Sequence, residues 1–249
     1  PLYSSAASDV YKRQERWSLV MEGNLFQQLI EYYSVNFGYL WDLFIKHLLM
    51  SVYGVLFAAI VGIPIGIVIA RYKKLSWTII TIANIIQTVP VIAMLAILML
   101  VMGLGPTTVV VTVFLYALLP IIKNTFTGIV GVDENIKDAG KGMGMTRNQV
   151  LRMIELPLSL SVILGGLRIA LVVAIGVVAV GSFIGAPTLG DIVIRGTNAT
   201  DGTTFILAGA IPIALIAILI DIFLRFLEKR LDPSNKTHKK KKHETQSIN

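Results

Sequence analysis

Few residues of this sequence are suited to catalysis. The chain has no cysteine, and its three histidines, His47, His238 and His243, are too scattered to indicate a metal site. The phosphate-binding pattern G-x-x-x-x-G-K-[ST] is absent, and no Asp or Glu lies in the middle of an apolar stretch. We therefore expect no catalytic residue, no metal and no cofactor, and a chain that cannot hydrolyse ATP itself.

The first candidates for function are neutral polar groups within an apolar stretch. Asn84, Gln87 and Thr88 have the i, i+3, i+4 spacing that places side chains on one face of a helix, and Pro90 lacks a backbone N–H. One interpretation is that these four residues line a route for a solute, with Pro90 permitting a bend that acts as a gate. The other is that they form ordinary hydrogen bonds between helices, worth about 0.6 kcal/mol each.

The second candidate is the segment 132–157, in which apolar and small residues recur with helical spacing on both sides of Gly144. The first group is Ile136, Ala139, Gly140 and Met143, and the second is Val150, Met153, Ile154 and Pro157. Gly144 suits a turn at positive φ, Thr146 and Gln149 are spaced as a capping box, and we expect Pro157 to end the second helix. This pattern predicts two short helices with an apolar stripe, which either docks to a soluble partner or lies on lipid.

The composition indicates that these candidates belong to a membrane protein. Hydrophobic residues make up 55% of the 249 residues and charged residues only 15%, with a mean hydropathy of +0.73. A soluble domain carries about 25% charged residues, so this chain has too few to cover a water-facing surface. The net charge of +7 includes the run Lys239–Lys242 near the C-terminus, which we interpret as a topology signal and not as a nucleic-acid site.

Five apolar stretches are long enough to cross a bilayer, for which a helix needs about 20 residues. They lie at about 48–70, 78–102, 108–130, 160–184 and 205–226. Lys and Arg gather after the first and third stretches and in the C-terminal tail, and basic loops stay in the cytoplasm. We therefore expect an all-α helix bundle in the cell membrane, with the N-terminus outside and the C-terminus and the 132–157 segment inside.

The two ends of the chain differ from the membrane part. Residues 1–20 show no apolar signal-peptide region, and we expect them to be a non-native leader, with Met21 as a plausible start. Residues 21–47 are predicted to form an outer amphipathic segment leading into a transmembrane domain at 48–231. Residues 232–249 are predicted to be a basic, disordered cytoplasmic tail that either attracts anionic lipid or only fixes the topology.

The 132–157 segment resembles the coupling loop of ABC-importer permeases, in which E-A-A, three residues, Gly, nine residues and I-x-L-P follow one another. The matching residues here are Asp138, Ala139, Gly140, Gly144, Ile154, Leu156 and Pro157. Asp138 keeps the charge of the Glu it replaces, while Gly140 costs about 1 kcal/mol of helix propensity relative to Ala. The resemblance implies that this loop docks in a cleft of a cytoplasmic ATP-binding-cassette ATPase dimer and transmits its nucleotide-driven movement.

Three further stretches resemble the osmoprotectant branch of these permeases: Gln87–Pro90, Gly165–Ala179 and Gly181–Ile192, the last departing from the expected glycine-rich form at Ala186–Thr188. The resemblance implies a type I importer permease fold and a solute such as glycine betaine, carnitine, choline or proline betaine. It also implies an external solute-binding protein and a second permease subunit, identical or homologous. Neutral groups around Gln87 suit a quaternary ammonium ion, which needs no counter-ion in transit.

Three alternatives remain open. A permease for methionine, another amino acid or an anion would share the coupling loop. An ion-coupled secondary transporter or channel usually has a carboxylate near the middle of the membrane, which this sequence lacks. A membrane scaffold without transport activity would not need a helix pair on the inner side.

Overall fold

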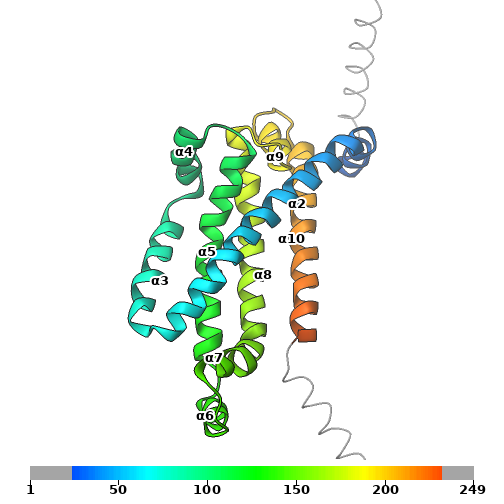
Figure 1. Cartoon of the computed structure of the whole chain (residues 1–249). Coiled ribbons are helices and arrows are strands. Elements are labelled where there is room, and N and C mark those ends of the chain that lie inside the picture. Colours follow the sequence, from blue (N-terminus) through cyan, green and yellow to red (C-terminus); the bar gives the residue numbers. More distant parts are fainter. Residues whose placement is uncertain (1–23, 232–249) are drawn as a thin grey trace, which may run out of the picture.

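The computed structural model describes residues 24–231, and every regular element in this range is a helix (Figure 1). The long helices are α2 (Leu25–Arg71), α5 (Pro106–Val130), α8 (Leu156–Val180) and α10 (Thr203–Leu231). The shorter elements are α3 (Lys73–Thr88), α4 (Val91–Met102), α6 (Glu134–Gly142), α7 (Arg147–Val150), the π-helical turn η1 (Leu151–Glu155), the 3-10 turn η2 (Gly181–Ile184) and α9 (Gly190–Thr197). The predicted leader at 1–20 and tail at 232–249 lie outside the described residues.

Four helices are long and apolar enough to cross a membrane: α2, α5, the continuous path from α7 to η2, and α10. Counted together as one broken span, the pair α3 and α4, whose axes are bent by 94°, brings the number to five. The predicted all-α bundle of about five membrane helices is confirmed. The second span differs in shape, because the single helix expected over 78–102 is broken at Val89 and Pro90.

Figure 1 shows the arrangement that positions the candidate sites. Helices α5, α8 and α10 run along the bundle, and α2 crosses them obliquely. Helices α6 and α7 lie at one end of the bundle, and α4 and α9 lie at the other. The two candidate groups are therefore separated: the 132–157 loop is at one end, and the break between α3 and α4 is partway along.

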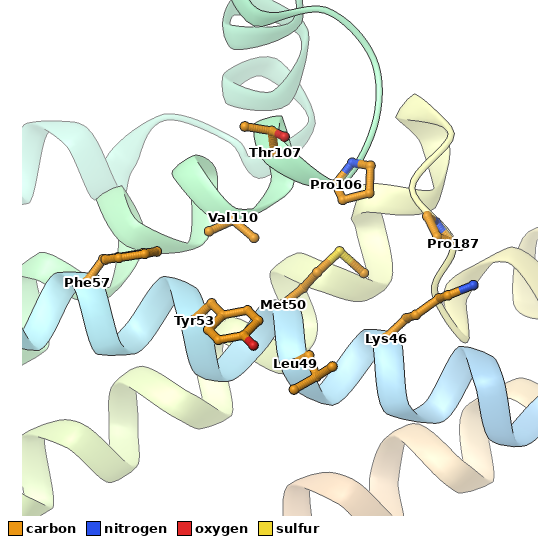
Figure 2. A pocket seen from close by; sticks show the side chains of 9 residues that line it. All are labelled: Lys46, Leu49, Met50, Tyr53, Phe57, Pro106, Thr107, Val110 and Pro187. Carbon is orange, nitrogen blue, oxygen red and sulfur yellow. The ribbon is translucent and has the colours of Figure 1, made fainter.

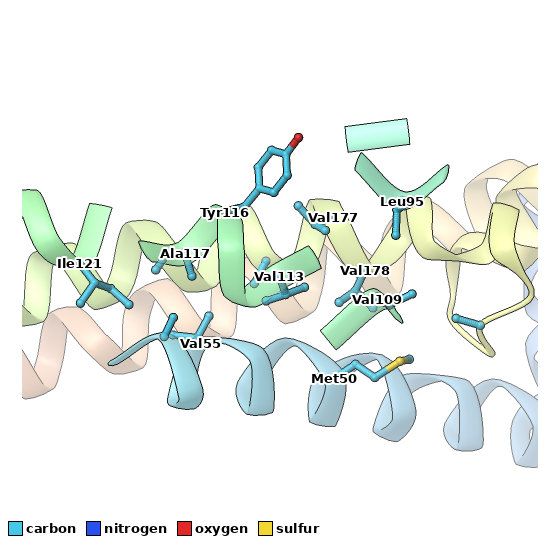
Figure 3. Packing of buried hydrophobic residues seen from close by; sticks show 14 of the residues in the cluster. Met50, Val55, Leu95, Val109, Val113, Tyr116, Ala117, Ile121, Val177 and Val178 are labelled. Carbon is cyan, nitrogen blue, oxygen red and sulfur yellow. The ribbon is translucent and has the colours of Figure 1, made fainter. Parts of the chain in front are cut away.

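Small residues bring α2 close to α5. A Cβ atom added at Gly54 would lie 2.3 Å from Val113 Cγ1, and one added at Gly66 would lie 2.5 Å from Thr125 Cβ. Membrane helices depend on such close contact because lipid provides little hydrophobic force between them. Around this contact, aliphatic side chains of α2, α5 and α8 form the main buried cluster (Figure 3). Helix α5 is thus held on two sides, by α2 and by α8.

Helix α2 extends well beyond the first predicted span. We expected an outer segment at 21–47 and a membrane span beginning at 48, but the helix continues from Leu25 to Arg71 with no break at that position. Its one residue with non-helical φ/ψ is Asn36. His47, near the expected boundary, is fully buried, and its Nε2 lies 3.1 Å from the carbonyl oxygen of Ile175 in α8. Packing against α8 therefore continues across the boundary near residue 48 at which hydropathy separated the outer segment from the first span.

Candidate functional site

The 132–157 loop contains the predicted first short helix, α6, and a second helical segment, α7, that continues into α8. The caps of both segments are local. Helix α6 begins after Asp133, whose carboxylate accepts a hydrogen bond from the Asn135 N–H at 2.9 Å. Gly144 has φ +83°, in the region that residues with a side chain rarely adopt. Thr146 N–H donates to Gln149 Oε1 at 2.7 Å, and Gln149 N–H donates to Thr146 Oγ1 at 3.4 Å. The predicted turn and capping box are both confirmed.

The structure divides the predicted apolar stripe into two sets. Gly140 faces the second helix, since a Cβ atom there would lie 2.6 Å from Ile154 Cδ1 and 3.7 Å from Val150 Cγ2. The remaining residues point away from the chain: Ile136, Met143 and Met153 are 45%, 75% and 63% exposed, and Ala139 is also exposed. Gly140, Val150 and Ile154 therefore join the helices. Ile136, Ala139, Met143 and Met153 form what we call the exposed apolar set, and Pro157, which is also exposed, lies farther along in α8.

Charged residues of α6 are paired within the helix. Lys141 Nζ donates to Asp138 Oδ1 at 2.8 Å, and Lys137 Nζ lies 2.9 Å from Glu134 Oε2. The hydrogen bond from Lys137 lowers the pKa of the Glu134 carboxyl, and the hydrogen bond to Asp138 raises the pKa of the Lys141 ammonium. Asp138, which stands where the permease pattern has Glu, is thus fixed by a neighbour one turn away.

Pro157 does not end the second helix, contrary to our expectation. Helix α7 continues through the wider turn η1 into α8, and the Leu156 N–H donates to Leu151 O, five residues earlier. Pro157 therefore lies inside a continuous helical path, just after the wider π-helical turn at Leu151–Glu155. Ile154, Leu156 and Pro157 therefore belong to one helical path that leads from the loop into a membrane span.

Arg71 links the loop to the end of α2, a role that the sequence did not reveal. Its Nη2 donates to Asn148 Oδ1 at 2.8 Å and to Arg147 O at 3.2 Å, both in α7. Helix α3 begins two residues later, after Tyr72. The spacing of 76 and 77 residues between donor and acceptors gives no local signal, and in the sequence Arg71 indicates only topology.

The polar residues of the second span do not form one equivalent face. Thr88 Oγ1 donates to Ile85 O in its own helix at 2.7 Å. Gln87 is half-buried, and its Nε2 donates to Tyr116 O of α5 at 3.4 Å. Asn84 is exposed, and its side chain forms no hydrogen bond with any residue in the range 24–231. Gln87 thus bonds between helices, as the second interpretation predicts. The solute-route interpretation stays a prediction, for which Asn84 is the residue with an exposed amide.

An apolar groove of about 520 Å³ opens toward the end of the bundle opposite the 132–157 loop (Figure 1). It lies between α2, α5 and the segment before α9 (Figure 2). Tyr53, Phe57 and Val110 line it, and Lys46 lies at its edge. Lys46 Nζ is 2.6 Å from Asp42 Oδ2, so its charge is already paired. None of the four candidate route residues lines this groove.

A comparison with known families decides the class of protein. Residues 62–233 match the family described as "Binding-protein-dependent transport system inner membrane component". This chain belongs to that family. The match includes the 132–157 loop, the broken second span and α10, so both candidate groups lie within it.

Curated relatives confirm the resemblance to the osmoprotectant branch. The chain is 60% identical over 210 residues to the "Glycine betaine/carnitine/choline transport system permease protein OpuCD" of Bacillus subtilis (strain 168), covering 84% of this chain and 92% of that protein. It is 55% identical over 220 residues to the "Choline transport system permease protein OpuBD" of the same organism, covering 88% and 97%. The family member described here is therefore a multi-pass membrane transport subunit.

A solved structure confirms the fold. The chain is similar to a chain of the inward-facing MetNI methionine ABC transporter, with a TM-score of 0.69 and coverage of 77% of this chain and 95% of that one. At 20% sequence identity, this likeness concerns the fold, which is that of a type I ABC importer permease.

Proposed function

We propose that this chain is the permease subunit of an ATP-driven importer of quaternary-ammonium osmoprotectants, such as glycine betaine, carnitine, choline or proline betaine. The observation that carries the proposal is the 60% identity, over nearly the whole membrane part, to a protein named for three of these solutes. The subunit itself is not an enzyme in this proposal, and a separate ATPase dimer hydrolyses the ATP. The solute crosses by alternating access.

The 132–157 loop is the proposed contact with the ATPase. Its coupling residues are Asp138, Ala139, Gly140, Gly144, Ile154, Leu156 and Pro157. The exposed apolar set supports this role, because apolar side chains on a polar, locally capped loop favour burial against a protein partner. The unbroken path from α7 through η1 to α8 gives a displaced loop a direct connection to a membrane span.

The proposed route for the solute passes the break between α3 and α4. Asn84, Gln87, Thr88 and Pro90 lie on or beside it, and of these Asn84 is the side chain with an uncommitted amide in the part of the chain that the structure describes. Neutral amide and hydroxyl groups can contact a quaternary ammonium ion and its carboxylate or hydroxyl without trapping it. A bundle of this size encloses the route together with a second permease subunit.

The remaining partners and the orientation follow from the same proposal. A solute-binding protein delivers the solute to the outer end, at α4 and α9, and the 132–157 loop and the C-terminus face the cytoplasm. Because the chain has no cysteine, Met143→Cys gives a single labelling site on the loop. A membrane-impermeant thiol reagent should label it only when added from the cytoplasmic side, and labelling from outside would reject this orientation.

The alternatives find less support. The likeness to a methionine transporter concerns only the fold, whereas the relatives named for betaine, carnitine and choline share more than half of their residues with this chain. For an ion-coupled transporter, the most suitable acid is Asp221 of α10, but Arg225 lies 3.0 Å from it and Arg168 3.8 Å, so its charge is balanced within the bundle.

Uptake by the assembled complex tests the proposal. The chain should be co-purified with its ATPase and receptor, placed in lipid vesicles and supplied with labelled glycine betaine, choline, carnitine or methionine. We expect ATP-dependent uptake of at least one quaternary ammonium compound and none of methionine. Uptake of methionine alone would favour the first alternative, and uptake that needs no ATPase would favour a secondary transporter.

A further inference from the structure

Two backbone carbonyl groups, those of Tyr116 and Val89, lack helical partners at the same place in the bundle. Pro120 lies inside α5 and has no N–H, so the carbonyl of Tyr116, four residues earlier, lacks its usual intrahelical donor. The carbonyl of Val89 lies at the break, between the end of α3 and the N-cap residue of α4, Pro90. Within a membrane, water does not readily satisfy such groups, so each needs a donor from the protein.

Each carbonyl is satisfied by a side chain from the other segment. Gln87 Nε2 of α3 donates to the Tyr116 carbonyl of α5 at 3.4 Å, and the Tyr116 hydroxyl of α5 donates to the Val89 carbonyl. Tyr116 is only 4% exposed, and in Figure 3 its ring leaves α5 on the side away from α2. We call this reciprocal pair of hydrogen bonds the proline clasp.

The clasp lies beside the break between α3 and α4, two helices that are tied to the rest of the bundle by different hydrogen bonds. Beyond the break, Leu95 of α4 is buried, and the turn into α5 is held by hydrogen bonds from Gly105 N–H to Ile184 O at 3.1 Å and from Thr108 Oγ1 to Gly103 O at 2.6 Å. Helix α3 also buries a single side chain, Ala83, as α4 buries only Leu95. Among the described residues, the one hydrogen bond from α3 to another helix is that of Gln87 to the Tyr116 carbonyl. Any movement of α3 relative to the frame of α5 and α8 therefore has to stretch or remake the clasp.

We infer that Tyr116 and Gln87 are positioning residues for transport, which set the angle between α3 and α4 through two carbonyls: that of Tyr116, which Pro120 leaves open, and that of Val89, which lies outside both helices at the break. This inference rests on the proposed transport function. It gives the Gln87 amide a role through α5 and not through direct contact with the solute. It also adds Tyr116, which lies outside the polar group seen in the sequence, to the machinery of the route.

Tyr116→Phe tests the hydroxyl half of the clasp, since it keeps the ring and removes only the donor. In vesicles holding the complete complex, we expect the maximal uptake rate per complex to fall about two- to tenfold, the effect of one lost hydrogen bond. We expect KM for the solute to change by less than about twofold and the ATP hydrolysed per solute to rise. Tyr53→Phe on α2 is the matched control, because Tyr53 is 48% exposed and its hydroxyl bonds to no residue within 24–231; all three quantities should stay at their wild-type values.

Gln87→Met combined with Pro120→Ala tests the amide half. Alanine at 120 restores an N–H that can donate to the Tyr116 carbonyl, so the Gln87 amide becomes dispensable. We expect Gln87→Met alone to lower the maximal rate about two- to tenfold, and to have less than about a 1.5-fold effect in the Pro120→Ala background.

The outcomes separate this inference from the proposed function. If the wild-type complex transports none of the quaternary ammonium compounds, the proposed function fails. If the wild type transports them, the inference is overturned by unchanged rates and ATP use in Tyr116→Phe. It is also overturned if Gln87→Met raises KM equally in both backgrounds, because that result would place Gln87 in contact with the solute.

Discussion

The 132–157 loop and the broken second span satisfy their polar groups in different ways. In the loop, Thr146 and Gln149 cap each other three residues apart, and Asp138 pairs with Lys141 at the same spacing. At the break, the hydrogen-bond partners are 27 and 29 residues apart in the sequence. The loop can thus keep its shape when it is displaced as a unit, whereas the shape of the break depends on where α5 lies. This difference suits a loop that a partner protein moves and a break in the second span that responds to the movement.

Of the variants that test whether the loop keeps its shape without help from the membrane helices, Gly144→Val should cause the largest loss of uptake. Its φ of +83° is strained for any residue with a Cβ and most of all for a β-branched one. A cost of about 1–2 kcal/mol or more should displace the first helix, and uptake should fall at least about tenfold, with loss of ATPase co-purification. Since the strain is confined to the loop, the protein should still be extracted as a folded membrane protein with a wild-type melting temperature.

Gly142→Val is the matched control for that change. Gly142 ends α6 only two residues away, and a Cβ added there meets no atom within 4 Å. ATPase binding and uptake should be close to wild type. Equal losses in both variants would show that the loop tolerates no added side chain, and backbone strain at Gly144 would not be the cause.

The two polar residues Asn84 and Thr88 near the break should differ in their effect on solute binding. Asn84→Leu removes an exposed amide that has no bond to another residue of the described part, so its loss should appear in solute handling and not in helix packing. We expect KM for the solute to rise about two- to tenfold, the effect of one hydrogen bond. Thr88→Val should change KM by less than about twofold, because its hydroxyl already donates to Ile85 O within α3. Transport assays that show the reverse order would contradict this assignment.

The same contrast explains what could be predicted from the sequence. The turn at Gly144 and the capping box of Thr146 and Gln149 depend on residues a few positions apart, so sequence spacing specified them correctly. The membrane spans were found because hydropathy over about 20 residues is also a local property. Gly140, which from the sequence differs from Ala only in helix propensity, also has a contact outside its own helix: Ile154 Cδ1 lies 2.6 Å from the place that a Cβ would take.

The features that the sequence did not reveal depend on distant contacts. The Arg71–Asn148 link and the Tyr116–Val89 bond join segments whose relative position is set by the packing of whole helices. Pro157 was wrongly expected to end a helix, because a proline pattern does not show that a π turn will precede it. Pro120 was a detectable signal for the open carbonyl of Tyr116, since a proline within a membrane helix leaves a carbonyl that another group must satisfy.

The third prediction tests whether the loop caps act only locally. Thr146→Ala removes one half of the capping box, which should cost about 1 kcal/mol of local stability, while Thr146→Ser should retain most of it. Hydrogen exchange should accelerate about fivefold at the first amides of α7, as expected for that energy. Exchange in α3 and α4 should be unchanged, and faster exchange there would show that the two regions are coupled in the resting protein.

The smallest effect is expected from Gly140→Ala, which restores the residue of the permease pattern. The new Cβ would lie 2.6 Å from Ile154 Cδ1, but that atom ends a flexible, half-buried side chain that can turn aside. The gain of about 1 kcal/mol in helix propensity should roughly offset this adjustment, leaving uptake and melting temperature within experimental error of wild type.

Gly166→Ala in α8 provides the contrast from the membrane region. There the added Cβ would meet Asn124 Cβ at 2.6 Å and the Pro120 carbonyl oxygen at 2.9 Å, and a backbone atom of a packed helix cannot turn aside. Overpacking of this kind costs about 1–3 kcal/mol, so this variant should melt at a lower temperature although the chemical change is identical. If both alanines prove neutral, the packing of α5 against α8 is more compliant than the contacts indicate. The evidence that the loop holds its own shape, whereas the shape of the break depends on α5, would then come from hydrogen bonds alone.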